Sequence, residues 1–324
     1  MCQELEGTAD LVPVLIGLTR LYMGRADRIA VEELMKQERT LVARLDDPAS
    51  LVQLHTQLGT TEMLRGALAQ SQEHHAQVLK LYNPTQHAAL SLTFGADPAV
   101  IALVLSGLSL WLAGWQDEAW NRAERGIAYA QKLNHPLSLA VALAYAGWVR
   151  QWRGERDQAW TLTQALATLE REHEFALNVT YAPIEQGRGL MQRGEFTTGV
   201  MLFTESLAQY RATGSRLLLP YFLSFLAEVY GEQGKLQEGL AIIDEALQFT
   251  ETNFDRFWAA EVYRIKGELT LQSQASLNRV EINPQIPVPG PRPPIPKTKR
   301  RSAFSKPLRL PASKKRSPWS CEQR

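Results

Sequence analysis

The sequence has few cysteines and no long apolar run. Its 324 residues include only Cys2 and Cys321, at opposite ends, which excludes a disulfide framework and fits a reducing cytoplasm. The longest apolar stretch, residues 100–113, is interrupted by serine and glycine and is too short to span a bilayer. No basic leader precedes an apolar segment at Met1, so no signal peptide is expected. We expect a cytoplasmic protein that makes no membrane contact.

Motifs that carry catalysis are also missing. The chain has no Gly-x-Ser-x-Gly, no phosphate-cradling Gly-x-x-x-x-Gly-Lys and no Cys-x-x-Cys. His74 and His75 are adjacent, whereas metal ligands on one helical face need a spacing of three or four, so a solvated helix face is expected for this pair. The sequence therefore predicts no catalytic residue, no metal ligand and no bound cofactor.

Charge is divided unevenly along the chain. Residues 275–324 hold twelve Lys and Arg and two Asp and Glu, a net charge of +10. Subtracting these from the totals of 35 and 34 leaves 23 basic and 32 acidic residues before Ala275, a net charge of −9. The basic clusters 297–301 and 314–316 could contact phosphates, but a solvated tail explains them without a partner, so nucleic-acid binding is not expected.

A repeat of about 40 residues organises most of the chain. Glycines recur at a spacing of 40 from Gly114 to Gly234, each in a short polar turn, and two upstream glycines continue the series at larger spacings. A small residue stands seven positions before each turn glycine, and another, with one exception at Ile29, stands five positions after it. Small residues on facing sides let two antiparallel helices pack closely around a permissive turn. The turn glycines are Gly24, Gly66, Gly114, Gly154, Gly194 and Gly234. The preceding small residues are Gly17, Gly59, Gly107, Gly147, Gly187 and Ala227, and the following ones are Ser71, Ala119, Ala159, Gly199 and Gly239.

These three positions resemble the small positions of the tetratricopeptide repeat. The period is longer than the usual 34 residues, and the sequence is similar to the extended repeats at the C-terminal end of large bacterial signal-transduction ATPases, including those linked to adenylyl cyclase or protein kinase domains. The similarity is closest from Tyr210 to Leu269, in runs such as Leu226-Ala-Glu-Val-Tyr230 and Glu261-Val-Tyr-Arg264. The resemblance implies an all-α, right-handed superhelical solenoid over residues 1–272. No nucleotide-binding or catalytic segment of those ATPases is present in this sequence.

The C-terminal end of the predicted array looks incomplete. Residues 257–271 are predicted to form a first helix with Gly267 at its small position, and a turn glycine due near residue 274 is missing. We expect this uncovered half-repeat to fray or self-associate. A Pro-rich linker follows over residues 273–298, with seven prolines between Pro284 and Pro296, and a basic disordered tail over residues 299–324. An adjacent reading frame over this tail can encode an amphipathic helix, so a frameshift product is one hypothesis for it.

The resemblance also suggests a binding groove. First helices of such solenoids line a concave face that holds a peptide or a partner helix. Transferring the family's groove positions onto this register selects seven residues, of the aromatic, arginine and glutamate types that contribute at interfaces. Packing between repeats is the alternative for any single tryptophan. The predicted groove residues are Trp111, Trp148, Trp152, Tyr181, Arg188, Tyr221 and Glu228.

Three functions remain open at this point. The first is a protein-interaction or sensory module of a bacterial signal-transduction ATPase or cyclase, in which a protein or peptide partner, or a core encoded upstream, occupies the groove. The second is a stand-alone scaffold that bridges two proteins. The third, an enzyme that uses surface histidines and glutamates, has no motif in its favour.

Overall fold

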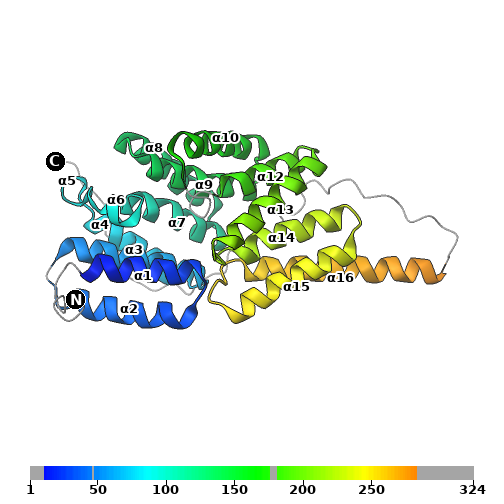
Figure 1. Cartoon of the computed structure of the whole chain (residues 1–324), viewed down its shortest axis with the longest axis horizontal. Helices are drawn as coiled ribbons and strands as arrows, with labels where there is room; N and C mark the ends of the chain where they lie inside the picture. Colours follow the sequence, from blue (N-terminus) through cyan, green and yellow to red (C-terminus); the bar gives the residue numbers. More distant parts are fainter. Residues whose placement is uncertain (1–10, 46, 176–180, 283–324) are drawn as a thin grey trace, which may run out of the picture. The chain divides into compact units, whose positions relative to one another are not determined.

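The computed structural model describes residues 11–45, 47–175 and 181–282, and over these ranges all regular structure is helical (Figure 1). The helices form six consecutive antiparallel pairs and one further first helix, which confirms the predicted all-α array of tetratricopeptide-like pairs. No helix in these ranges is long and apolar enough to cross a membrane. The pairs are α1 (Leu11–Gly24) with α2 (Arg28–Val42), α3 (Pro48–Leu64) with α4 (Leu68–Leu81), α7 (Pro98–Leu112) with α8 (Gln116–Leu133), α9 (Pro136–Trp152) with α10 (Arg156–His173), α12 (Ala182–Gln192) with α13 (Phe196–Ala212) and α14 (Leu219–Glu232) with α15 (Leu236–Thr252).

Two short helices interrupt the regular series. Helices α5 (Pro84–His87) and α6 (Leu90–Phe94) lie between α4 and α7, and they account for the larger spacing from Gly66 to Gly114. The first helices of the third and fourth pairs begin with proline, whose fixed φ and missing N–H suit the first helical turn. Asp97 caps α7 by accepting the N–H groups of Ala99 and Val100.

The turn glycines are required by backbone geometry in five pairs. Gly66, Gly114, Gly154, Gly194 and Gly234 all have φ between 76° and 93°, the left-handed region in which a Cβ is strained. This confirms the sequence prediction for these five turns.

The first pair departs from the predicted register. Gly24 is the last helical residue of α1, and Ala26 takes the left-handed turn position with φ 56°. The small position seven residues earlier is therefore Thr19, which is fully buried, and not Gly17, which is exposed. Val31, five residues after Ala26, is fully buried where the prediction had Ile29, which is exposed. The prediction was wrong here because it followed glycine as a residue type, whereas the turn needs only a tolerated positive φ.

The small positions bring paired helices close together. A Cβ added to Gly187 of α12 would lie 2.7 Å from the backbone nitrogen of Phe203 in α13, and one added to Gly107 of α7 would lie 3.0 Å from the carbonyl oxygen of Ala119 in α8. Gly239 of α15 approaches the carbonyl oxygen of Ala227 equally closely. Close backbone packing is therefore the reason for glycine at these sites.

Helices far apart in sequence also touch. The N–H groups of Arg216 and Leu217, just before α14, donate to the carbonyl oxygen of Gly24 at 2.7 and 3.2 Å. The N–H of Arg256 donates to the carbonyl oxygen of Leu64 at 2.6 Å. The ends of α1 and α3 thus contact the segments that precede α14 and the final helix.

The final helix, α16 (Ala259–Ile282), is a first helix whose partner is absent from the described residues. It continues past residue 272, where the sequence analysis ended the array. The rest of the predicted linker, from residue 283, and the predicted tail over residues 299–324 lie outside the described residues.

Candidate protein-binding surface

A buried ion pair lies among the aromatic residues of α9, α12 and α14. The Nε1–H of Trp148 donates to Glu185 Oε1 at 3.0 Å, and Arg188 Nη1 lies 3.5 Å from Glu185 Oε2. The guanidinium carbon of Arg188 is 4.2 Å from the ring centroid of Phe225 and 4.7 Å from that of Tyr221, whose hydroxyl accepts a bond from Arg188. The two charged side chains are only 4 % and 6 % exposed. We call Trp148, Glu185, Arg188 and Tyr221 the inner cluster.

Burial sets the electrostatics of the inner cluster. Loss of solvent raises the pKa of Glu185, and the charge of Arg188 and the bond from Trp148 oppose that rise. Burial likewise raises the pKa of the Tyr221 hydroxyl, against the nearby positive charge of Arg188. Each group relies on another member for its partner, so the inner cluster fixes the relative positions of three helices.

A second, partly exposed group of aromatic residues adjoins the inner cluster. The rings of Trp152 and Trp258 stack with centroids 5.0 Å apart at 22°, and Trp111 lies 6.1 Å from Trp152. Trp258 is fixed by its Nε1–H bond to Ser224 Oγ at 3.0 Å and by edge contact with Tyr221. The three tryptophans keep part of their surface in solvent.

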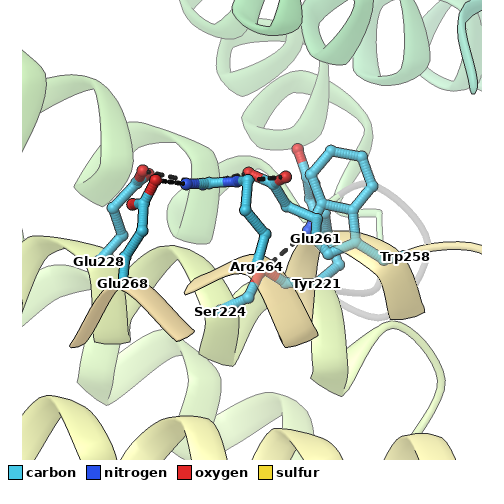
Figure 2. Close-up of polar contacts among 7 residues, drawn as sticks. All are labelled: Tyr221, Ser224, Glu228, Trp258, Glu261, Arg264 and Glu268. Atoms are coloured by element: carbon cyan, nitrogen blue, oxygen red, sulfur yellow. Dashed lines mark hydrogen bonds and ion pairs between the residues drawn. The ribbon is translucent and has the colours of Figure 1, made fainter. Parts of the chain in front are cut away.

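Beside Trp258, one arginine contacts three glutamates (Figure 2). Arg264 Nη1 lies 2.6 Å from Glu268 Oε1, and Nη2 lies 3.3 Å from Glu228 Oε1 and 2.5 Å from Glu261 Oε1. These side chains are 22–43 % exposed. Desolvation lowers the pKa of Arg264, but the adjacent carboxylates raise it by a larger amount. The pKa therefore lies above its usual value and the guanidinium stays charged.

The partly exposed residues form one candidate surface, which we call the Trp–Arg264 surface. It combines indole rings with three carboxylates and one guanidinium. The net charge of these four groups is −2 when all are ionised. A cation that approaches it meets both aromatic faces and carboxylates. Its members are Trp111, Trp152, Trp258, Glu228, Glu261, Arg264 and Glu268.

All seven residues of the predicted groove lie in or beside these two clusters. Trp148, Tyr181, Arg188 and Tyr221 are buried, at 1–5 % exposure, and Tyr181 packs 6.1 Å from Trp148. The other three, Trp111, Trp152 and Glu228, belong to the Trp–Arg264 surface. A groove role for the set stays a prediction.

Trp258, Glu261, Arg264 and Glu268 were not among the predicted groove residues. Adding one repeat of 40 residues to Tyr221 and Glu228 gives Glu261 and Glu268, so the same register could have found these two, whereas Trp258 and Arg264 correspond to no predicted groove position.

The prediction of a solvated face for the adjacent histidines was wrong. His75 is fully buried, with its Cδ2 only 2.5 Å from where a Cβ on Gly59 would lie. It occupies the position held by the buried Phe203 and Ile243 in later second helices, and burial lowers its pKa to about 3. His74 is partly buried, and its Nδ1 lies 3.0 Å from that of His55. Within the described ranges no group of three or more His, Cys, Asp or Glu could hold a metal ion.

Comparison with known proteins supports the fold. No family model matches the chain. An uncharacterised protein of Rhizobium meliloti (strain 1021) is 22 % identical over 232 residues, which make up 71 % of this chain and 22 % of that protein. The chain therefore spans about a fifth of the length of this relative.

Two solved structures share the fold. The apo form of RapI superposes with a TM-score of 0.54 at 8 % identity, over 84 % of this chain and 99 % of RapI. A Rap protein complexed with competence and sporulation factor superposes with a TM-score of 0.50 at 14 % identity, over 78 % of this chain and 74 % of that one. The chain is thus a tetratricopeptide-like helical repeat protein with a Rap-like fold.

Proposed function

We propose that this chain is a non-catalytic protein-interaction scaffold that binds a protein or peptide partner at the Trp–Arg264 surface. The observation that carries the proposal is the placement of three partly exposed tryptophans beside three carboxylates and one arginine. Aromatic and arginine side chains contribute most of the binding energy at protein interfaces. A Rap protein of the same fold was solved in complex with competence and sporulation factor, so this fold can hold a partner.

The chemistry of the surface selects a class of partner. This surface has three carboxylates and one guanidinium, and the stacked Trp152 and Trp258 supply apolar surface. A segment that carries a lysine or arginine beside an aromatic or branched apolar residue satisfies both features. The inner cluster would keep the tryptophans in place and make no direct contact with the partner.

Selection from a displayed library of random peptides tests this proposal. We expect the full chain to enrich peptides that contain a basic residue next to an apolar one. Trp258→Ala and Glu261→Gln should each lower the affinity of the chain for a selected peptide by about tenfold. Arg122→Gln is the matched control, because Arg122 forms an exposed ion pair with Glu118 on a second helix. Peptides that bind the surface variants and the wild-type chain equally would refute the proposed surface.

A second candidate is a sensory module within bacterial signalling by an ATPase or cyclase in the cytoplasm. The Rhizobium meliloti relative supports only the idea of a module within a larger protein, because the matched segment makes up 22 % of that longer, uncharacterised protein. In this case partner occupancy would change the state of an ATPase or cyclase core. The gene neighbourhood provides the test: an ATPase or cyclase frame directly upstream, whose product co-purifies with this chain, supports the candidate. An isolated frame favours the stand-alone scaffold.

A further inference from the structure

Two histidines face each other across the second helix pair. The Nδ1 atoms of His55 in α3 and His74 in α4 lie 3.0 Å apart, and the ring centroids lie 5.2 Å apart with 41° between the ring planes. Both residues are partly exposed, whereas His75, the next residue in the sequence, is fully buried. The two imidazoles therefore meet at a place that solvent and small ions can reach.

Only one proton fits between the two facing nitrogens. One Nδ1 donates and the other accepts, so at least one lone pair is free for another electrophile. Burial lowers the pKa of both imidazoles, and Arg39 lowers that of His74 further. The carboxylates of Glu62 and Glu73 act in the opposite direction on His74, so they favour positive charge at this place. At neutral pH the pair is thus in the neutral form that binds metal ions.

We propose that His55 and His74 together bind one divalent late transition-metal ion, Cu²⁺ or Ni²⁺, through their Nδ1 atoms. Metal–nitrogen bonds of about 2.0–2.1 Å place two nitrogens at neighbouring corners of a square-planar or octahedral ion about 2.8–3.0 Å apart. The observed distance of 3.0 Å matches this spacing. A tetrahedral ion needs about 3.3–3.4 Å between its ligands, so Zn²⁺ should bind less well.

Binding needs side-chain rotation but no movement of the helices. Each ring turns so that both lone pairs point at one ion, and the partial exposure of both residues leaves room for this turn. Water completes the coordination, because no third His, Cys, Asp or Glu joins the pair in the part of the chain that the structure describes. The pair has no signature in the sequence, since its members are 19 residues apart on two helices and not three or four apart on one.

Titration of the full chain with Cu²⁺, followed by electron paramagnetic resonance, tests the proposal. The parent for this experiment carries Cys2→Ser and Cys321→Ser, because thiols compete for copper. We expect one ion per chain with a signal from nitrogen ligands. His55→Gln and His74→Gln should each lower the affinity at least about tenfold. His173→Gln, at the exposed last residue of α10, is the matched control and should bind like the parent.

Thermal unfolding provides a second readout. An ion held by α3 and α4 stabilises the folded chain, so Ni²⁺ should raise the Tm of the parent and of His173→Gln but not that of His55→Gln or His74→Gln. Circular dichroism without metal verifies that every variant is folded.

Three results would overturn the proposal. The first is a parent chain that binds neither ion. The second is copper bound equally by the parent and by both variants of the pair, because the ligands would then lie elsewhere. The third is tighter binding of Zn²⁺ than of Cu²⁺, which contradicts the geometry. The inference does not depend on the proposed function, because metal binding is measured without a peptide partner.

Discussion

Two Glu-x-x-Arg pairs with the same spacing occupy opposite environments in this molecule. Glu185 and Arg188 of α12 are 4 % and 6 % exposed, within the inner cluster. Glu261 and Arg264 of α16 are 34 % and 25 % exposed, on the Trp–Arg264 surface (Figure 2). The first pair contacts aromatic rings, and the second contacts further carboxylates. Their burial differs because α12 is packed between α10 and α13, whereas α16 packs mainly on α14 and α15 among the described helices.

The comparison shows that the same two residue types can serve two purposes. The buried pair holds helices together, whereas the partly exposed pair is accessible to a binding partner. A buried ion pair must find all of its partners within the fold, and its loss is felt as lost stability. An exposed pair contributes little to stability, so its residues can serve binding with little effect on folding. The experiments below test this separation, from the largest expected effect to the smallest.

Replacing Arg188 should cause the largest loss. Arg188→Met leaves Glu185 buried without its cation and should lower the free energy of unfolding by roughly 3–5 kcal/mol. Urea unfolding followed by circular dichroism measures the change. The double variant Glu185→Leu with Arg188→Met should recover most of the loss, because no buried charge remains. Equal losses in the single and double variants would show that packing, and not charge, dominates the inner cluster.

The pH dependence of stability should depend on buried carboxyls. Burial raises the pKa of Asp255 to about 7, against the bond that its Oδ2 accepts from the Leu218 N–H. The usual value is 3.8, so the folded state holds a proton that the unfolded state has lost, and stability falls as pH rises from about 4 to about 7. Asp255→Asn should remove part of that decline, on the order of 2 kcal/mol or more.

Thermal unfolding across this pH window checks the Asp255 prediction. Glu38→Gln is a matched comparison, since burial also raises the pKa of Glu38 to about 7. We expect each variant to flatten the profile and the two effects to add, since the two side chains lie in different repeats. Parallel profiles for wild type and both variants would contradict the protonated state of these carboxyls in the folded chain.

Substitution by alanine should change stability differently at a turn glycine and at Gly24 of α1. Gly154 has φ 78° and open space around it, so Gly154→Ala should cost about 1 kcal/mol from backbone strain alone. Gly24 is helical with nothing within 4 Å, so Gly24→Ala should leave stability unchanged or raise it by a few tenths of a kcal/mol. A loss at Gly24 equal to that at Gly154 would restore the register first predicted from the sequence.

Only a small loss of stability is expected on replacing Arg264. Arg264→Gln removes a partly exposed cation from three partly exposed carboxylates and should cost less than about 1 kcal/mol. The same urea experiment measures it beside Arg188→Met. A loss as large as that of Arg188→Met would remove the distinction between the two clusters.

The sequence predicted the array well because its strongest signal is a backbone requirement. A left-handed turn and a close helix crossing admit few residue types, so the glycines from Gly66 to Gly234 are visible without a structure. In the first pair Ala26 adopts the positive φ and Thr19 fills the small position, so glycine marks neither position there.

The candidate site was harder to predict. Burial of Trp148 or Arg188 depends on which residues of later helices pack against them, such as Tyr221. These contacts join residues far apart in sequence, and no local pattern encodes them. His75 was missed for a related reason, since its burial follows from its repeat position and not from its neighbour His74.

Titration calorimetry with one peptide selected on the wild-type chain tests the central claim most directly. We expect the double variant Glu228→Gln with Glu261→Gln to bind this peptide at least about tenfold more weakly than wild type, with an unchanged urea midpoint and with Arg122→Gln binding normally. Unchanged affinity in the double variant would contradict the account, because the Trp–Arg264 surface would then play no part in holding a partner.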